Sequence, residues 1–185
     1  MASALIVLAE GFEEIEALAT ADVLRRGGVK AALASLGNEL ETVGAHGIKV
    51  CADVTLESVK DELFDAIVLP GGGLGTENLK SSHLLFDILR HHKEEDRLLC
   101  AICAAPTVLV EAGVLDPDQQ ITCYPTCVME LDRKAVAVPA IADGNVITAQ
   151  GPGSSLLFGL VILKHLTTEA LAHKVARAMV TDCLG

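Results

Sequence analysis

One cysteine of this 185-residue chain stands where a nucleophile is expected. Cys103 follows the strand-like run 97–102 and precedes Ala104-Ala105-Pro106, and these small neighbours permit a sharp turn from a strand into a helix. A thiol at a helix start faces the positive end of the helix dipole, which favours the thiolate. A free cysteine is more often a small buried hydrophobic residue, and we keep that interpretation for Cys100 and Cys183. At Cys103 the position on the turn favours nucleophilic chemistry.

The cysteine spacing also allows a metal interpretation. Cys100 and Cys103 form one pair and Cys123 and Cys127 a second, at a separation near that of a zinc ribbon. The residues around the first pair are apolar rather than the Gly or polar residues of a zinc knuckle. Alternation along a strand would also point Cys100 and Cys103 to opposite faces. We therefore expect no metal site.

A glycine triplet follows another predicted strand. Gly71-Gly72-Gly73 lets backbone N–H groups approach a ligand without obstruction by side chains. We assign Gly71 and Gly72 to substrate binding, with the N–H groups of Gly72 and Ala104 forming an oxyanion hole. A glycine triplet alone is more often only a flexible turn. A dinucleotide site is excluded because the first strand is followed by acidic residues and lacks G-x-G-x-x-G.

Three carboxylates crowd the start of the first predicted helix. Glu13 and Glu14 are explained as solvated residues that complement the helix dipole. Glu16 has apolar neighbours and is expected to turn inward. A carboxyl in an apolar pocket beside a thiolate has a raised pKa and can donate or accept protons.

The elements that position these residues alternate between short apolar runs and helical patterns. Strands are predicted at 4–9, 29–36, 49–52, 65–69, 97–102, 121–123 and 136–140, and the run 145–149 leads into Gly151-Pro152-Gly153. Helices are predicted at 13–26, 82–92, 104–113, 154–165 and 168–181. This order predicts one α/β domain over residues 1–185, with a mostly parallel sheet between helices. Ligands of such sheets bind at the carboxyl ends of the strands, which here are followed by the segments 10–16, 70–75, 103–106 and 150–154.

Composition excludes several classes of partner. The formal net charge is −11 and aromatic residues make up 3% of the chain, so neither a basic field nor a base-stacking platform is available for nucleic acid. The apolar runs are too short for a membrane-spanning helix, and no positively charged signal region precedes the first one. We expect a cytoplasmic protein that binds neither nucleic acid nor membrane.

Together these segments resemble the DJ/ThiJ/PfpI superfamily, and within it the Parkinson-disease protein deglycase branch. The likeness is carried by ALIVLAEGFEEIEAL from Ala4, DVLRRGG from Asp22, IVLPGGGLGTENL from Ile67, AICAAPTVL from Ala101 and QGPGSSLLFGL from Gln150. It implies a flavodoxin-like three-layer sandwich that forms homodimers.

The resemblance also implies roles for individual residues. Cys103 matches the oxidation-prone nucleophile of the family and Glu16 its protonated carboxyl partner, while Gly72 and Ala104 match the backbone oxyanion donors. The matched dimer contacts are Glu13, Ile15, Arg26 and the peripheral thiol Cys51.

Three positions depart from the family or from some of its members. Tyr124 stands where many relatives have a histidine, which removes the usual imidazole and puts a Cys-His dyad in doubt. His46 replaces an arginine of some relatives, which weakens an anion contact near the site. Ala104 follows Cys103 where peptidase members have a histidine, so peptidase activity is rejected.

The resemblance and these residues favour a cofactor-independent glyoxalase or deglycase that acts on methylglyoxal, glyoxal or their early protein adducts. Cys103 would attack the aldehyde, Glu16 would move the proton, and Tyr124 would supply a hydrogen-bond donor but a poor base. The alternative from another class is a redox sensor or redox-regulated chaperone, in which Cys103 is oxidised and Glu16 stabilises the product. A third interpretation is a silent dimer that keeps only the fold.

Overall fold

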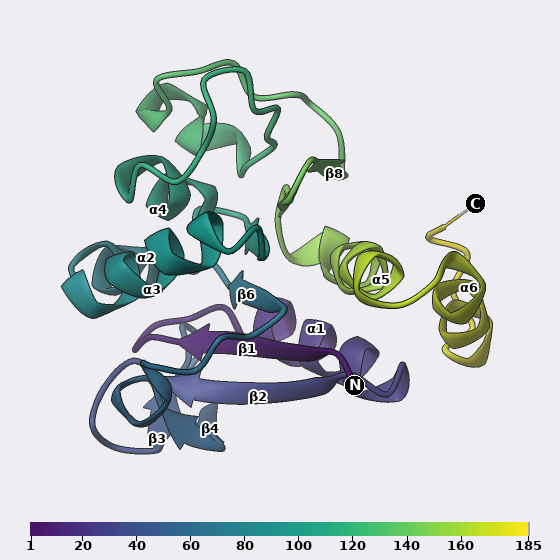
Figure 1. Cartoon of the computed structure of the whole chain (residues 1–185), viewed down its shortest axis with the longest axis horizontal. Helices are drawn as coiled ribbons and strands as arrows, with labels where there is room; N and C mark the ends of the chain where they lie inside the picture. The colour runs from purple at the N-terminus through teal and green to yellow at the C-terminus, as the bar shows by residue number, and fades with distance from the viewer. Residues whose placement is uncertain (185) are drawn as a thin grey trace.

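The computed structural model describes residues 1–184 and is built on a seven-stranded sheet (Figure 1). The strands lie in the order β5 (Val54–Thr55), β2 (Lys30–Ser35), β1 (Ser3–Leu8), β6 (Ala66–Leu69), β7 (Leu98–Ile102), β9 (Val146–Ala149) and β8 (Ala140–Asp143). All neighbours are parallel except β8, which runs antiparallel to β9. A separate antiparallel hairpin joins β3 (Glu41–Val43) to β4 (Lys49–Cys51).

Helices cover both faces of this sheet, as Figure 1 shows. One face is packed by α1 (Glu14–Arg26) and α5 (Ser155–Leu166), with α6 (Glu169–Ala178) against α5, and the other by α2 (Gly73–Lys80), α3 (His83–Glu94) and α4 (Pro106–Glu111). Three short 3₁₀ helices complete the fold: η1 (Glu57–Val59), η2 (Pro125–Glu130) and η3 (Pro152–Ser154). The predicted α/β sandwich with a mostly parallel sheet is confirmed.

Alternation along β1 explains why there are two cores. Ile6 and Leu8 point into the core shared with α1 and α5, whereas Leu5 and Val7 point into the core shared with α3 and α4. All four side chains are buried, which is why this strand is a continuous apolar run.

Two predicted strands are wrong. In place of strands at 121–123 and 136–140 the structure has one isolated bridge, between Ile121 and Ala135. The Thr122 N–H donates to Oγ1 of Thr148 at 2.8 Å, and the Thr122 hydroxyl donates to the carbonyl of Val138 at 3.0 Å. Side-chain hydrogen bonds of this kind compete with a regular ladder.

The segment 70–75 was expected to be a loop, but α2 begins within it at Gly73. Gly72 has a φ of +95°, which glycine adopts at little cost, and its carbonyl accepts the N–H of Thr76. Glycine has a poor helix propensity, so its presence in the first turn hid the helix from the sequence pattern.

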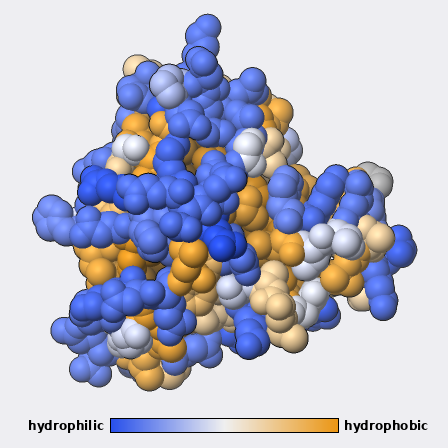
Figure 2. Space-filling view, in the orientation of Figure 1, coloured by the Kyte–Doolittle hydropathy of each residue, from blue (hydrophilic) through white to orange (hydrophobic). Residues whose placement is uncertain are grey.

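Hydrophilic side chains cover much of the face seen in Figure 2, with hydrophobic atoms showing between them. Within residues 1–184, no helix has both the length and the apolar character that crossing a bilayer requires.

Candidate active site

Cys103 lies immediately after β7, at the carboxyl edge of the sheet. Its φ is +66°, a left-handed conformation that is uncommon for residues other than glycine and that is found at strained functional turns. The turn is held by the Cys103 N–H, which donates to the carbonyl of Ala149 at 2.9 Å. The side chain is partly exposed. The predicted turn at the strand end is therefore present, and the residue is not fully buried.

The expected separation of Cys100 and Cys103 onto opposite faces is wrong. Both side chains pack against the core that contains α1 and α5. The strand ends at Ile102, and the positive φ of Cys103 breaks the alternation that a continued strand would impose.

Glu16 is fully buried in the first turn of α1. Its Oε2 accepts the N–H of Gly71 at 2.6 Å, and its Oε1 has no hydrogen-bond partner among the described residues. A Cβ built on Gly71 would lie 2.7 Å from Cβ of Cys103 and 2.8 Å from Oε2 of Glu16. Only glycine therefore fits between the two side chains without displacing one of them.

The titration of Glu16 and Cys103 is coupled. Burial is the main reason that the pKa of Glu16 rises to about 7, against the hydrogen bond from Gly71. Burial and the Glu16 carboxylate raise the pKa of the Cys103 thiol to about 12, opposite to the direction expected from the helix dipole. The helix α4 begins only at Pro106 and has six residues, so its dipole acts weakly on Cys103. The repulsion from Glu16 disappears when Glu16 carries the proton, so the thiolate forms most readily in that state.

Backbone N–H groups surround the sulfur. Those of Ala104 and Gly72 act on Cys103 and lower its pKa, opposing the effect of burial. Both were expected to be oxyanion donors, and their position beside the reacting atom suits that role. The Gly71 N–H is engaged by Glu16 and so is not available to a substrate oxygen.

Tyr124 lies beside Cys103 through its backbone. The Tyr124 N–H donates to the Cys103 carbonyl at 2.7 Å, and the side chain is 43% exposed. A Cβ on Gly151 would lie 3.3 Å from the Tyr124 ring, which places the ring next to the segment that follows β9. The residue that replaces the usual histidine is thus adjacent to the site.

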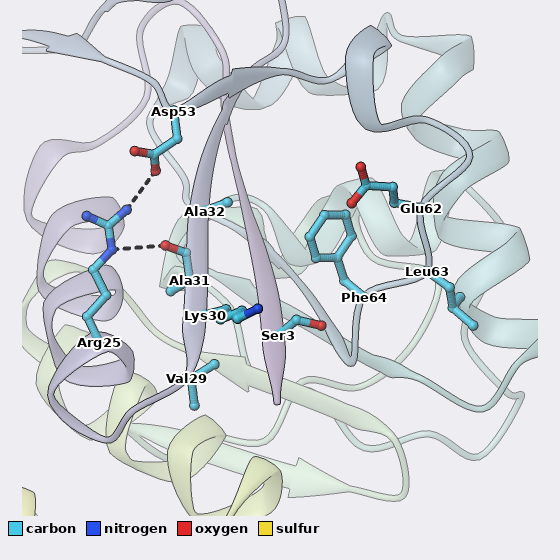
Figure 3. A pocket seen from close by; sticks show the side chains of 10 residues that line it. All are labelled: Ser3, Arg25, Val29, Lys30, Ala31, Ala32, Asp53, Glu62, Leu63 and Phe64. Atoms are coloured by element: carbon cyan, nitrogen blue, oxygen red, sulfur yellow. Dashed lines mark hydrogen bonds and ion pairs between the residues drawn. The ribbon is translucent and has the colours of Figure 1, made fainter. Parts of the chain in front are cut away.

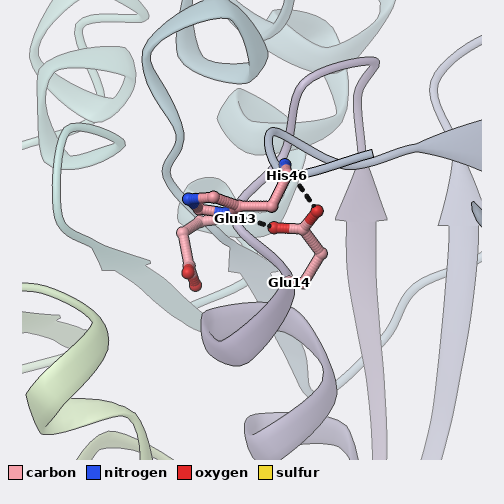
Figure 4. Close-up of side chains that lie close together, drawn as sticks. All are labelled: Glu13, Glu14 and His46. Carbon is pink, nitrogen blue, oxygen red and sulfur yellow. Dashed lines mark hydrogen bonds and ion pairs between the residues drawn. The ribbon is translucent and has the colours of Figure 1, made fainter. Parts of the chain in front are cut away.

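Glu13 and Glu14 are buried, and the expectation that both are solvated is wrong. Glu13 is the N-cap of α1, and its Oε2 accepts the N–H of Glu16 at 2.8 Å. Glu14 turns the other way, where its two oxygens accept the backbone N–H and the Nδ1 of His46, both at 2.7 Å (Figure 4). This pairing raises the pKa of His46 and lowers that of Glu14. The sequence signal for it was the departure at His46.

Within residues 1–184, one group of three potential metal-binding side chains lies close together. It consists of Glu13, Glu14 and His46, whose ligand atoms are within 4.8 Å of one another. Hydrogen bonds from the protein already occupy both oxygens of Glu14 and one of Glu13. The cysteine pairs considered for zinc do not contribute to such a group in this part of the chain.

The residues expected at a dimer contact do not all lie at the surface. Ile15, Arg26 and Cys51 are exposed, and Arg26 pairs with Asp22 at 2.6 Å. Glu13 is only 7% exposed and is used inside the chain.

A cavity of about 500 Å³ lies at the opposite edge of the sheet (Figure 3). It is lined by Ser3 and Lys30, which begin β1 and β2, and by the ion pair of Arg25 with Asp53. Cys103 lies at the carboxyl ends of the strands, where ligands of open α/β sheets bind. We therefore do not assign this cavity to the reaction.

The fold and the site define an α/β protein with a cysteine on a strained strand-to-helix turn beside a buried glutamate. The chain belongs to the DJ-1/PfpI family, because the sequence model of that family matches residues 2–165.

Two curated relatives extend the comparison over most of the chain. Protein dj-1beta of Drosophila melanogaster is 37% identical over 184 residues, covering 96% of both chains. Glutathione-independent glyoxalase DJR-1.2 of Caenorhabditis elegans is 37% identical over 169 residues, covering 89% of this chain and 88% of the relative.

Solved structures agree with the fold. The crystal structure of Drosophila melanogaster DJ-1beta matches with a TM-score of 0.94 at 36% identity, over 97% of this chain and 98% of that one. A Toxoplasma gondii DJ-1 structure described as oxidized matches with a TM-score of 0.95 at 29% identity, over 98% and 100% of the two chains.

Proposed function

We propose that this chain is a cofactor-independent enzyme that converts small dicarbonyls, such as methylglyoxal and glyoxal, into hydroxy acids. The observation that carries the proposal is the partly exposed Cys103 beside a buried Glu16 whose pKa is about 7. A group that titrates near neutrality is suited to both donating and accepting a proton. The relative named as a glutathione-independent glyoxalase supports the same reaction class.

The reaction begins when the Cys103 sulfur attacks the aldehyde carbon of methylglyoxal and forms a hemithioacetal. Glu16 donates its proton to the developing oxygen anion and, as a carboxylate, removes the proton from the former aldehyde carbon. The resulting enediol is reprotonated at the neighbouring carbon, which gives a thioester of lactate. Water then hydrolyses the thioester, releasing lactate and the free thiol, so the net reaction adds one water to methylglyoxal.

Each oxygen anion on this path needs a hydrogen-bond donor. The N–H groups of Gly72 and Ala104 lie beside the sulfur, and we assign them to the oxygen of the carbonyl that the sulfur attacks. One such donor contributes about 3 kcal/mol to transition-state stabilisation. The phenol of Tyr124 is a further donor at the rim. It is a poor base at neutral pH because the unperturbed pKa of a phenol is about 10, so we expect slow turnover.

Early adducts of the same dicarbonyls with protein amines and thiols release the aldehyde reversibly. We include them as substrates because the same sulfur can capture the same carbon. The cytoplasmic location expected from the sequence remains a proposal with this activity.

A second candidate function is redox sensing or a redox-regulated chaperone activity. It is favoured by the buried Oε1 of Glu16, which lacks a partner and which, when protonated, can donate to an oxygen added to Cys103. The related Toxoplasma gondii structure is described as oxidized. Mass spectrometry after mild peroxide treatment separates the outcomes: two oxygens on Cys103 alone support sensing, and oxidation spread over all six cysteines contradicts it.

We also propose that the chain forms a homodimer through the outer face of α1. Ile15 and Leu18 are exposed there, and Ile48 is exposed on the adjacent hairpin, whose N–H groups bind Glu14. Exposed aliphatic side chains that cluster on one face are typical of an interface. Sedimentation analysis should give a dimer for the native chain and a monomer for Ile15→Asp, and a monomeric native chain would contradict the proposal.

The test of the enzymatic proposal is lactate formation from methylglyoxal without glutathione. We expect turnover by the native protein and by Cys183→Ala, and turnover lower by about a hundredfold or more with Cys103→Ala. Cys183 is exposed near the C-terminus, so the expectation that it is buried is wrong. Equal rates for Cys103→Ala and the native protein, or no lactate above the buffer rate with the native protein, would end the proposal.

A further inference from the structure

Glu13, Glu16 and Gly71 are linked pairwise by three hydrogen bonds. Glu16 carries the carboxyl proposed to react, and Gly71 binds that carboxyl. The Oε2 of Glu13 accepts the N–H of Glu16 at 2.8 Å, the Glu13 N–H donates to the carbonyl of Gly71 at 2.9 Å, and the Gly71 N–H donates to Oε2 of Glu16 at 2.6 Å. A Cβ on Gly72 would lie 2.9 Å from the Glu13 nitrogen, so the glycine loop packs directly against this residue. Glu13 is thereby fixed relative to Glu16.

A glutamate is an unusual choice for this position. Helix N-caps are usually Ser, Thr, Asp or Asn, which satisfy the same N–H group with a shorter side chain, and most of them carry no charge. Glu13 brings a second carboxyl, only 7% exposed, next to Glu16. The carboxyl group of Glu13 lies within 4.8 Å of that of Glu14, although the two side chains project in different directions (Figure 4). A hydrogen bond alone does not explain why an acid occupies this place.

A ring nitrogen of His46 lies within 4.8 Å of a Glu13 carboxylate oxygen, and the charge of Glu13 adds to the effect of Glu14 in raising the pKa of His46. No ion pair to Glu13 occurs within residues 1–184, and the nearby His46 is exposed and makes its own pair with Glu14. The titratable groups that act on Glu16 are Glu13 from α1 and Cys103 from the turn after β7. Burial is the main reason that the pKa of Glu16 is high, and the charge of Glu13 adds to it.

We propose that Glu13 is a positioning residue whose negative charge keeps the proton on Glu16, and so favours the thiolate form of Cys103. The inference rests on the proposed role of the Cys103–Glu16 pair and extends it to a residue that the resemblance assigns to the dimer contact. A proton held by Glu16 removes the repulsion that an ionised Glu16 exerts on the sulfur. Removing the charge of Glu13 shifts the proton equilibrium between the two groups further toward the ionised carboxyl and the protonated thiol.

Two substitutions separate charge from shape. Glu13→Gln keeps an oxygen that can accept the Glu16 N–H but loses the charge, whereas Glu13→Asp keeps both the charge and a good N-cap. Glu39→Gln removes one charge at an exposed position and controls for net charge. The readout is the rate at which iodoacetamide alkylates Cys103, measured on its peptide at neutral pH, because only the thiolate reacts and the rate follows even a small thiolate fraction.

We expect Glu13→Gln to lower the alkylation rate by about three- to tenfold, which corresponds to a half to one pKa unit. Glu13→Asp and Glu39→Gln should stay near the native rate. A Glu13→Gln variant with native values, or Glu13→Asp impaired as much as Glu13→Gln, would overturn the inference, since the second result indicates a purely structural role. Thermal unfolding of each variant checks that it is folded. Alkylation does not need turnover, so the inference can fail or survive independently of the glyoxalase proposal.

Discussion

The backbone N–H of Gly71 donates a 2.6 Å hydrogen bond to Oε2 of Glu16, joining residues 55 positions apart in the chain. Gly71 follows β6, and Glu16 lies in the first turn of α1, so the bond connects two different strand-to-helix crossovers. It fixes one oxygen of the carboxyl and leaves Oε1 without a partner. The geometry of the site therefore depends on a residue with no side chain.

Gly71→Ala should impair the site more than the fold. The new Cβ would lie 2.7 Å from Cβ of Cys103 and 2.8 Å from Oε2 of Glu16, so one of these side chains must move. We expect conversion of methylglyoxal to fall at least tenfold, with a loss of about 1–3 kcal/mol in the free energy of unfolding. Gly73→Ala is the matched control, because a Cβ there meets nothing within 4 Å. Similar rates for the two variants would show that the space around Gly71 does not matter.

The raised pKa of Glu16 predicts a pH dependence of stability. Its pKa rises from 4.5 to about 7 on folding, so the native state binds more protons than the unfolded state between these values. The stabilisation from protonated Glu16 is complete below about pH 4.5 and is lost as the pH rises through about 7. Relative to Glu16→Gln, which cannot titrate, the native chain should lose about 3 kcal/mol between about pH 4.5 and pH 8.

Urea unfolding of both proteins across this pH range measures the difference. Parallel stability curves for the native chain and Glu16→Gln would mean that Glu16 is ionised throughout and does not hold a proton for the reaction.

His92 predicts a second pH effect, of the opposite sign and at lower pH. The ring is buried, its Nδ1 donates to the carbonyl of Ile88 at 2.8 Å, and its Nε2 accepts the N–H of Phe64 at 3.1 Å. Burial lowers its pKa below 6.5 in the folded protein. The stabilisation from neutral His92 is therefore present above about pH 6.5 and is lost as the pH falls.

Replacing His92 with Leu should lower stability at neutral pH, because the Phe64 N–H loses its acceptor, but should also flatten the stability curve below about pH 6.5. His83→Gln, at an exposed position of the same helix, should leave the curve unchanged. Chemical unfolding at a series of pH values checks this. If the His92 variant lost as much stability below about pH 6.5 as the native chain, the pH effect would come from other groups.

A substitution at Tyr124 is expected to raise the rate of the proposed reaction. The Tyr124 N–H already bonds to the Cys103 carbonyl, and the partly exposed ring lies beside Gly151. Tyr124→His introduces an imidazole that titrates near neutral pH, so we expect a higher kcat for methylglyoxal, by about tenfold or more. Tyr124→Phe should reduce the rate only slightly if the phenol acts as a weak donor. Steady-state kinetics of the three proteins decide, and a slower Tyr124→His would show that the tyrosine is not a substitute for the missing base.

The sequence predicted the strands and helices that carry the site because their patterns are local. Continuous apolar runs marked β1, β6 and β7, and small residues around Cys103 marked the turn that lifts the sulfur from the sheet. Glycines concealed α2, and threonine side-chain bonds replaced the strands expected near Ile121. The expected extent of a single domain remains a prediction.

The electrostatics of the site could not be predicted in the same way. Whether Glu13 is solvated depends on the glycine loop after β6 that packs over it, and whether Glu14 is exposed depends on the hairpin that carries His46. The pKa of Cys103 depends on how deeply the sulfur is buried and on how far away α4 begins. These are properties of contacts between distant segments, and residue spacing does not record them.

The central claim is that Cys103 and Glu16 act as one unit, and a double-mutant cycle on kcat/KM for methylglyoxal without glutathione tests it most directly. We predict that Cys103→Ala and Glu16→Gln each lower kcat/KM by about a hundredfold or more, and that the double variant is no slower than the worse single variant. Two losses that multiply in the double variant, or a single variant as fast as the native chain, would contradict the account.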